Sequence, residues 1–318
     1  MCKSASCTDY LDTLQVTSDL LNKRAERKAI TSSQIKHLLK LDSPLHNQYE
    51  RAERCNQILF LKQNLVTGEE KVTANYCGKR FCSVCSAIKT AEMMNSYFEP
   101  VSNLKDLHFV TLTVKSVKAD RVKSKIREMI KTFTKLKDSM RKADRSISGI
   151  RKVECNYNPD ADTYNPHFHL IISGRNRSIE IIDRWLSYNP DAVIEAQDIQ
   201  KANEDSLKEL FKYSVKSCAG GDIVSPVALD AIYRALSGVR TFQNFGDVQK
   251  SSETVDNSEL DAEYQIEDNE ALTGQWRTID CFTWSHHHST WINDNGEPLY
   301  TSNIRQKVQN MVAQINSG

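Results

Sequence analysis

The segment 164–173, Tyr-Asn-Pro-His-Phe-His-Leu-Ile-Ile-Ser, constrains the fold more than any other part of the sequence. Its β-branched and aromatic residues predict a β-strand, in which successive side chains point to opposite faces. His167 and His169 then share one face, while Phe168 and Leu170 occupy the other. Two imidazoles one strand step apart are able to bind one divalent metal ion. The alternative is a pair of ordinary strand histidines, one of them facing solvent.

A second informative segment lies further along the chain and predicts an amphipathic helix from Ser206 to Cys218. Apolar residues recur in it at helical spacing: Leu207, Leu210, Phe211, Val215 and Cys218. Gly220 and Gly221 follow and suit a helix C-cap. At about 100° per residue, Glu209, Tyr213 and Lys216 fall within an arc of roughly 60° on the opposite side. The alternative is a solvated face, in which Ser206 and Glu209 form a capping box.

Together the two segments contain the parts of one reaction. A metal ion on His167 and His169 polarises a phosphate, and Tyr213 attacks it in line. Lys216 holds the phosphate or favours the phenolate form of the tyrosine, and a nearby carboxylate activates water to resolve the covalent bond. This combination predicts metal-assisted phosphoryl transfer through a covalent intermediate.

The same residues carry a resemblance to a known family. His167-Phe168-His169, followed by the helix with Tyr213 and Lys216, is similar to the HUH endonucleases. More closely, the sequence resembles the rolling-circle replication initiator (Rep) proteins of small bacterial plasmids. Four segments match this family. Residues 108–114 resemble the family's first conserved strand, residues 165–169 its metal-binding strand, and residues 209–217 its nicking helix. Cys77-x4-Cys82-x2-Cys85, which precedes them in the chain, resembles the cysteine cluster of one branch of the family. Asn165 departs from the pattern, because many relatives begin this motif with another histidine.

The resemblance implies an α+β fold, with an HUH-type nuclease core of a mostly antiparallel sheet and flanking helices, preceded by a small cysteine-rich zinc module. It implies a plasmid replication initiator that binds the double-strand origin and nicks one strand at an exposed, single-stranded or hairpin site. Tyr213 would form a 5′-phosphotyrosine and free a 3′-hydroxyl primer, Lys216 would orient the phosphate, and Glu209 would activate water for the terminating cleavage. The family also implies a host replication helicase and polymerase as partners.

Strand parity predicts a third metal ligand. Residues 149–156 are expected to form a strand, and the turn-forming segment 158–162 joins it to the histidine strand as an antiparallel hairpin. Lys152 and Glu154 share a face, and the hairpin sets Glu154 opposite the two histidines. We therefore expect Glu154 to complete a site for Mg²⁺ or Mn²⁺, since mixed histidine and carboxylate ligation suits Mn²⁺ and Mg²⁺ prefers oxygen. The alternative is that Glu154 pairs with a lysine or arginine across the strands.

Nine cysteines in a chain that shows no secretory segment favour metal ligands and buried thiols over disulfides. Cys82-Ser83-Val84-Cys85 is a Cys-x2-Cys turn, which can present two thiolates to one tetrahedral Zn²⁺. Cys77 and Cys55 are the expected third and fourth ligands. Strands over 58–61 and 71–74 would form a ribbon with the cysteines at its base. A redox-active Cys-x2-Cys is the alternative, but the surrounding βαβ pattern is missing.

Several basic residues are expected to contact DNA. Lys79, Arg80 and Lys89 surround the cysteine turn, and Arg240 lies among aromatic residues that are able to stack on single-stranded bases. Packing is the alternative for that aromatic segment. Eight of the 41 acidic residues lie between 251 and 276, which contains no Lys or Arg, so the rest of the chain is basic. A basic body suits a phosphate-backbone partner, although an acidic run can also serve solubility alone.

The hydrophobic periodicity predicts the remaining elements. A helix over 86–99 is expected to end before Pro100, and 108–114 to form a core strand. The other expected elements are an amphipathic helix over 122–140 that packs on the sheet, helices over 178–188 and 225–236, and a strand over 192–199.

The expected organisation has five parts: a helical and basic N-terminal arm (1–48), the cysteine-rich zinc module (49–99), the nuclease core with its nicking helix (100–246), an acidic disordered linker (247–275), and a Trp- and His-containing segment that packs on the body (276–318). The arm either touches DNA or is a surface helix. The run His286-His287-His288 is either metal-binding or a surface tract, with no catalytic role expected. No apolar run is long enough to span a membrane, no membrane partner is expected, and the expected location is the cytoplasm.

Two other functions remain open from the sequence. A transposase or relaxase of the HUH type would use the same chemistry, although the chain length and the cysteine cluster favour replication. A zinc-dependent DNA-binding regulator without catalysis would need only the cysteine module and a basic surface. A metal-dependent nicking assay on supercoiled DNA separates the regulator from the enzymes.

Overall fold

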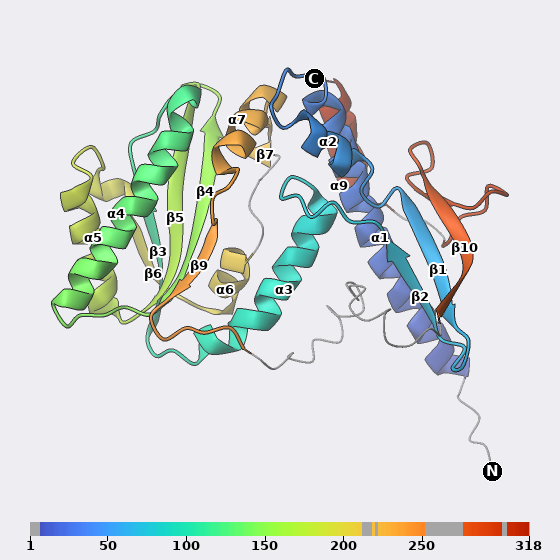
Figure 1. Cartoon of the computed structure of the whole chain (residues 1–318), viewed down its shortest axis with the longest axis horizontal. Coiled ribbons are helices and arrows are strands. Elements are labelled where there is room, and N and C mark those ends of the chain that lie inside the picture. The colour runs from blue at the N-terminus through green and yellow to red at the C-terminus, as the bar shows by residue number, and fades with distance from the viewer. Residues whose placement is uncertain (1–6, 212–217, 220–221, 252–275, 301–303, 318) are drawn as a thin grey trace, which may run out of the picture. The chain divides into compact units, whose positions relative to one another are not determined.

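The computed structural model describes the backbone of residues 7–211, 218–219, 222–251, 276–300 and 304–317, and the side chains of these ranges except 7–18, 204, 208, 218–219 and 222–223. The chain divides into two compact units (Figure 1). The terminal unit comprises Met1–Ile88 and Asp256–Gly318, and the central unit comprises Lys89–Val255. All described strand pairs are antiparallel and helices flank the sheets, which confirms the α+β class.

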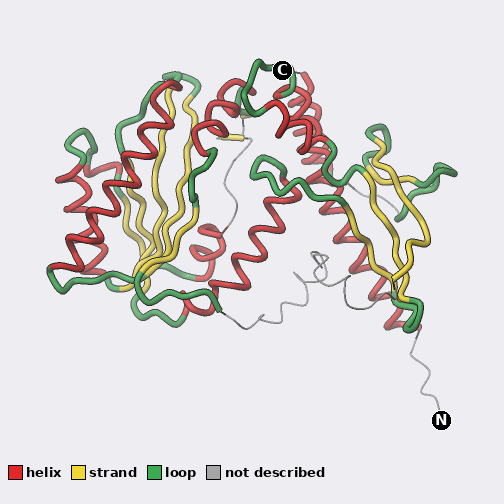
Figure 2. The backbone as a smooth tube through the Cα atoms, in the orientation of Figure 1, coloured by secondary structure: helices red, strands yellow, loops and turns green. Residues whose placement is uncertain are grey.

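The terminal unit contains a four-stranded sheet in the order β11-β10-β1-β2, one of the groups of yellow strands in Figure 2. Its strands are β1 (Ile58–Asn64), β2 (Glu70–Ala74), β10 (Trp276–Ser285) and β11 (Thr290–Ile292). Its helices are α1 (Cys7–Leu38), α2 (His46–Glu53), α9 (Gln306–Ser317) and the first turns of α3 (Ser83–Ser102). The expected ribbon of β1 and β2 is confirmed, and β10 extends it from the other end of the sequence.

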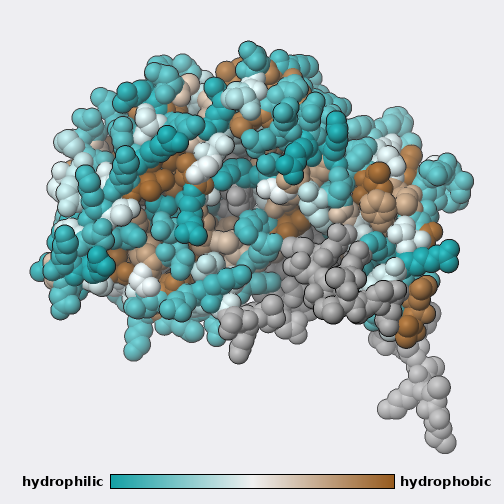
Figure 3. Space-filling view, viewed as in Figure 1, coloured by the Kyte–Doolittle hydropathy of each residue, from teal (hydrophilic) through white to brown (hydrophobic). Residues whose placement is uncertain are grey.

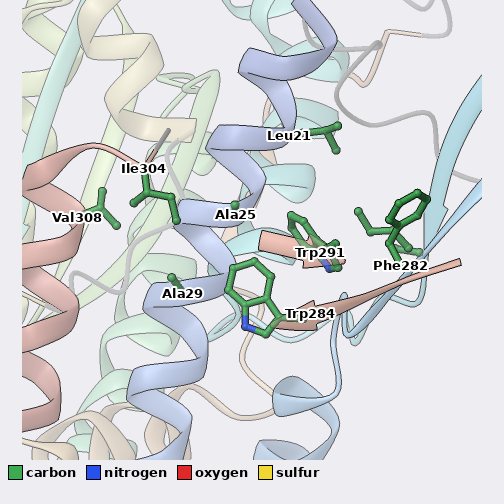
Figure 4. Packing of buried hydrophobic residues seen from close by; sticks show 10 residues of the cluster. Leu21, Ala25, Ala29, Phe282, Trp284, Trp291, Ile304 and Val308 are labelled. Carbon is green, nitrogen blue, oxygen red and sulfur yellow. The ribbon is translucent and has the colours of Figure 1, made fainter. Parts of the chain in front are cut away.

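The expected N-terminal arm is instead part of the core of the terminal unit. Leu21, Ala25 and Ala29 of α1 are buried in one hydrophobic cluster with Trp284 and Trp291 of the C-terminal strands (Figure 4). The expected boundaries of 1–48, 49–99 and 276–318 therefore do not separate independent bodies, because all three segments contribute to this unit.

The central unit contains a five-stranded sheet in the order β6-β3-β5-β4-β9. Its strands are β3 (Leu107–Thr113), β4 (Gly149–Asn158), β5 (Thr163–Ser173), β6 (Asp198–Lys201) and β9 (Phe242–Phe245). Its helices are the rest of α3, α4 (Val122–Lys142), α5 (Arg175–Tyr188), α6 (Glu204–Phe211) and α7 (Pro226–Leu236), with 3-10 turns at Ala119–Arg121 and Ile194–Ala196. The histidine strand β5 is therefore the middle strand, as Figure 1 shows.

Helices α4 and α5 cover one face of this sheet and fix the orientation of β5. The ring of Phe168 lies 5.7 Å from that of Phe133 on α4 and 5.6 Å from that of Trp185 on α5, measured between ring centroids. Phe168 is fully buried there. Because alternate residues of a strand face opposite sides, anchoring Phe168 in this layer turns His167 and His169 to the other face, as the sequence predicted.

The second face of the sheet is covered by α6 and the later part of α3, which share a hydrophobic cluster with Ile150 and Ile171. Helix α3 continues past Pro100 to Ser102, so the expected end before Pro100 is wrong. Proline has no N–H to donate to the carbonyl one turn earlier. That carbonyl, of Ser96, instead accepts a hydrogen bond from the N–H of Ser251 (2.9 Å), which satisfies the group that Pro100 leaves without a helical donor.

Helix α6 begins earlier and ends earlier than expected. The side-chain oxygen of Asn203 accepts a hydrogen bond from the N–H of Ser206 (2.9 Å), so Asn203 is the residue that caps the helix. The proposed capping box of Ser206 and Glu209 is therefore wrong. Cys218 lies in the short strand β7 (Cys218–Ala219), which pairs with β8 (Asp222–Ile223), so the helix does not reach it. Residues 212–217, which contain Tyr213 and Lys216, lie outside the described residues.

The remaining expectations are confirmed in part. Helices α5 and α7 occur where they were expected, whereas the strand expected over 192–199 is limited to Asp198–Lys201 after a 3-10 turn. The acidic linker lies largely in 252–275, outside the described residues. On the face shown in Figure 3 most side chains are hydrophilic, with hydrophobic ones in small groups between them. Among the helices that are described, none combines the length and apolarity needed to cross a bilayer.

Candidate metal centres and active site

The first candidate centre joins Glu154, His167 and His169, whose potential ligand atoms lie within 4.8 Å of one another. Strands β4 and β5 pair so that Glu154 lies directly opposite His167, as strand parity predicted. Oε2 of Glu154 lies 3.8 Å from Nε2 of each histidine. The side chain of His169 keeps 20% of its surface exposed while the other two are buried, so the centre is open to solvent on the side of His169.

Hydrogen bonds orient both imidazole rings. Nδ1 of His167 lies 3.0 Å from the carbonyl oxygen of Asn165. Because a carbonyl can only accept, this nitrogen carries the proton and donates, which leaves the lone pair of Nε2 facing Glu154. Nδ1 of His169 lies 3.2 Å from Oγ1 of Thr111, and its ring packs on Phe109 with 5.1 Å between centroids.

The protonation states suit metal binding. Burial lowers the pKa of His169 to about 4, so its ring is neutral at neutral pH. Burial alone would raise the pKa of Glu154, but the Lys152 ammonium and the two histidines outweigh it, and the pKa of this carboxyl is lowered. Two atoms that each lie about 2.1 Å from one ion are at most about 4.2 Å apart. The three side chains therefore fit a Mg²⁺ or Mn²⁺ ion after small movements.

Lys152 lies in the same centre, and the sequence assigned it no role beyond its face of the strand. Its Nζ is 2.6 Å from Oε1 of Glu154 and donates a hydrogen bond to the main-chain oxygen of Glu209 (3.2 Å). Both side chains of the Lys152–Glu154 pair are buried. Glu154 thus pairs with a lysine two residues earlier on its own strand, not with a basic residue across the strands as the alternative expected, and it keeps its contacts with the histidines. The pair uses one carboxylate oxygen and the histidines face the other.

Helix α6 brings Glu209 to the centre. Leu207, Leu210 and Phe211 of this helix are buried against the sheet. Glu209 is half-buried, and its negative charge acts on His169 in the direction that raises the histidine pKa. Tyr213 and Lys216 follow in the segment that the structure does not describe, so their positions come from the sequence alone.

The second candidate centre consists of four buried thiols, those of Cys55, Cys77, Cys82 and Cys85. Sγ–Sγ separations of 3.5, 3.6 and 3.6 Å link Cys55 to Cys85, Cys77 to Cys85 and Cys82 to Cys55. These distances exceed a disulfide bond of about 2.05 Å. They are close to the roughly 3.8 Å between sulfurs of a tetrahedral zinc site with Zn–S bonds of about 2.3 Å. Cys55, the ligand with the weakest sequence signal, joins the other three.

Main-chain donors and a buried lysine stabilise negative charge on these sulfurs. The N–H groups of Cys77, Gly78 and Lys79 point to sulfur atoms of the cluster at 3.3–3.4 Å. The Lys28 ammonium from α1 is buried beside it and donates to the main-chain oxygens of Glu53 and Cys55 at 2.7 and 2.6 Å. A tetrahedral site of four thiolates around Zn²⁺ carries two negative charges, so a nearby ammonium offsets part of them.

The residues expected to contact DNA lie in both units. Lys79 and Arg80 are half-buried beside the cysteine cluster, and Lys89 is exposed and pairs with Glu92 (2.6 Å). Arg240 is exposed, and its main-chain oxygen accepts a hydrogen bond from Arg151 (3.1 Å). The aromatic residues that follow Arg240 pack in the central unit, in agreement with the packing alternative.

The histidine run 286–288 forms the turn between β10 and β11. Nδ1 of His286 accepts a hydrogen bond from the indole N–H of Trp284 (3.3 Å). In the described part of the chain this run joins neither group of potential metal ligands.

Comparison with known proteins identifies the class. A family model described as "Replication protein" matches residues 69–178, a range that contains both metal-ligand groups except Cys55. A "Protein rep" of Staphylococcus aureus is 31% identical over 54% of this chain and 82% of its own length. Relatives with the same name from Bacillus sp. and Bacillus amyloliquefaciens are 29% and 30% identical, over 56% and 52% of this chain and 69% and 59% of their own lengths. No solved structure matches.

The chain therefore belongs to the replication protein (Rep) family. The resemblance to rolling-circle replication initiators of plasmids, first seen in the His-x-His strand and the cysteine cluster, is confirmed by these matches.

Proposed function

We propose that this chain binds the double-strand origin of a plasmid and nicks one strand at a single-stranded site, starting rolling-circle replication. One observation carries the proposal: two imidazoles and a carboxylate converge on one open centre, next to the helix that leads to Tyr213. Membership of the replication protein family supports it. The site of action is the cytoplasm, where a plasmid replicates.

The reaction is a transfer of one phosphodiester to the protein. A Mg²⁺ or Mn²⁺ ion held by Glu154, His167 and His169 supplies polarisation of the scissile phosphate. The phenolate oxygen of Tyr213 attacks phosphorus, the bond to the 3′-oxygen breaks, and that oxygen takes up a proton. The products are a 5′-phosphotyrosine and a 3′-hydroxyl primer, which a host helicase and polymerase use. Lys216 orients the phosphate, and Glu209 activates water for the terminating cleavage.

Basic side chains around these centres are proposed contacts for the DNA backbone. Lys79, Arg80 and Lys89 in and beside the cysteine segment, together with Arg240 in the central unit, would neutralise phosphates. The affinity that such contacts contribute falls as the salt concentration increases. The salt dependence of origin binding therefore reports on these contacts.

The test is incubation of the protein with an origin-bearing oligonucleotide in Mn²⁺, followed by mass spectrometry of the tryptic peptides. A peptide containing Tyr213 that carries a 5′-phosphorylated nucleotide is the expected result, and it should disappear when EDTA is added. A non-catalytic zinc-dependent regulator binds the duplex and forms no adduct. A transposase or relaxase would instead form the adduct on DNA that carries its own recognition site in place of the replication origin.

The four cysteines are proposed to hold one structural Zn²⁺. The tetrahedral spacing of their sulfurs, the three N–H···S contacts and the adjacent Lys28 support this assignment. The ion would connect the β1–β2 ribbon, which Cys55 and Cys77 flank, to the start of α3, where Cys82 and Cys85 lie.

Replacing Cys82 by serine is expected to release about one zinc per chain and to lower the free energy of unfolding by about 4 kcal/mol or more, because structural zinc contributes folding free energy directly. Metal analysis of the purified protein and denaturant unfolding measure the two effects. Cys281→Ser is the matched control, since Cys281 is an exposed thiol of the same unit and should leave both values unchanged. Wild-type protein that contains no zinc would exclude the assignment.

A further inference from the structure

We propose, on the basis of the proposed nicking function, that Lys152 is a positioning residue of the active site. It holds one oxygen of Glu154 away from the histidines and ties the main chain of helix α6, at Glu209, to the strand that carries Glu154. Neither the family match nor the sequence motifs assign a role to this residue.

The two oxygens of the Glu154 carboxylate have different partners. Oε1 is 2.6 Å from the Lys152 ammonium, whereas Oε2 is 3.8 Å from Nε2 of both His167 and His169. An ammonium at hydrogen-bonding distance restrains the carboxylate strongly, because charge-assisted hydrogen bonds are about twice as strong as neutral ones. The carboxylate then offers a single oxygen to an ion between the histidines, and coordination positions remain for the oxygens of a phosphate.

The Lys152 ammonium also links the sheet to helix α6. The same Nζ donates to the main-chain oxygen of Glu209 at 3.2 Å, across 57 residues of sequence. Glu209 is four residues before Tyr213, so this bond fixes the segment that leads to the proposed nucleophile. A displacement of the nucleophile by about 1 Å can cost about a hundredfold in rate. A bond that fixes the segment in this way acts on rate more than on DNA affinity.

A lysine at position 152 carries a free-energy cost. Lys152 is 5% exposed, and burial of an ammonium disfavours its charged form. A methionine of similar length on this face would pack with the apolar residues of the sheet without that cost. The lysine also adds positive charge next to a cation site, which opposes metal binding and favours an anionic substrate. The ion pair with Glu154 offsets part of the burial cost, whereas the placement beside the metal ligands is the feature that a positioning role explains.

Lys152→Met is the test variant. We expect it to lower the nicking rate without weakening the binding of Mn²⁺. The single-turnover nicking rate at saturating Mn²⁺ should fall about 10- to 100-fold, the range expected for loss of hydrogen bonds to charged groups. The Kd for Mn²⁺, measured by electron paramagnetic resonance without DNA, should be unchanged or lower. The second carboxylate oxygen becomes available to the ion, and the opposing charge is gone.

Two companion variants keep the test decisive. Lys152→Arg retains a cation with hydrogen-bond donors and should nick faster than Lys152→Met. Lys125→Met removes a lysine that pairs with Glu128 on the exposed face of α4 (2.8 Å) and should match wild type in both measurements. Lys152→Gln is measured in parallel and replaces Lys152→Met if that variant does not fold.

A nicking rate of Lys152→Met within twofold of wild type would overturn the inference. So would a raised Kd with a nicking rate that recovers at higher Mn²⁺, or equal rates for the Met and Arg variants. If wild-type protein neither nicks nor forms an adduct, the proposed function itself has failed. The Mn²⁺ affinities require no DNA and then still test whether Lys152 restrains Glu154, because a lower Kd for Lys152→Met supports the restraint and a raised Kd contradicts it.

Discussion

Replacing His167 or His169 by alanine is expected to lower the nicking rate about a thousandfold while leaving duplex origin affinity within about threefold of wild type. Metal polarisation of a phosphate contributes several kcal/mol to the transition state, and each 1.4 kcal/mol is a factor of about ten in rate. Duplex affinity comes mainly from phosphate contacts made by basic side chains elsewhere. Nicking of supercoiled origin plasmid in Mn²⁺ and gel-shift titration of an origin duplex measure the two quantities.

His287→Ala is the matched control for these variants. His287 is exposed in the turn between β10 and β11 and lies outside both groups of potential ligands among the described residues. It should nick at the wild-type rate. Wild-type rates for both His167→Ala and His169→Ala would show that the ligand assignment is wrong. Glu154→Ala should lower the nicking rate as the His167→Ala and His169→Ala variants do. If it nicks normally and changes the Mn²⁺ affinity only slightly, Glu154 orients the histidines and does not bind the metal.

The histidine centre could be predicted because each step depended on a short-range rule. Strand alternation gave the common face of His167 and His169, and a single hairpin gave the register that sets Glu154 opposite them. The Cys-x2-Cys turn gave two thiols, and the hairpin at 58–74 brought Cys55 and Cys77 to the same end. Local geometry determines all of these positions, so one sequence is enough to derive them.

Contacts between distant parts of the chain could not be predicted. Strand β10 pairs with β1 across more than 200 residues, for example Phe282 with Leu59, and no local pattern selects that partner. The same holds for the burial of α1, whose alanines gave a weak hydrophobic signal. Helix α3 passes Pro100 because Ser251, far along the chain, donates to the carbonyl that the proline leaves unsatisfied.

Lys152 and Glu209 illustrate a different limit. Parity assigned Lys152 to the correct face, but only the packing of α6 on the sheet brings the Glu209 carbonyl within 3.2 Å of its ammonium. Glu209 was also given a possible capping role with Ser206, which the structure excludes because Asn203 caps the helix. The exclusion matters for function, since it removes the simplest structural explanation for a carboxylate at this position.

The second large effect concerns Tyr213, whose replacement by phenylalanine is expected to abolish the covalent adduct. The substitution keeps the aromatic ring and removes the phenol oxygen, which is the proposed nucleophile. Origin binding should remain within about threefold of wild type, because phosphate contacts dominate affinity. Denaturing gels with end-labelled origin DNA, which reveal a protein-linked strand, measure the loss. An adduct of normal yield in Tyr213→Phe would assign the nucleophile to another residue.

Glu209→Gln is the companion variant that separates initiation from termination. A tyrosine cleaves and leaves a protein–DNA bond, whereas water activated by a carboxylate cleaves and leaves none, so the two groups suit the start and the end of a replication round. Glu209 is close enough for its charge to act on His169, and glutamine keeps its size and its main-chain bond to Lys152. Glu209→Gln should therefore still form the Tyr213 adduct but fail to terminate cleanly, giving plasmid products longer than one unit. Gel analysis of replication products decides the matter, since unit-length circles at wild-type frequency would show that the Glu209 carboxylate is not required for termination.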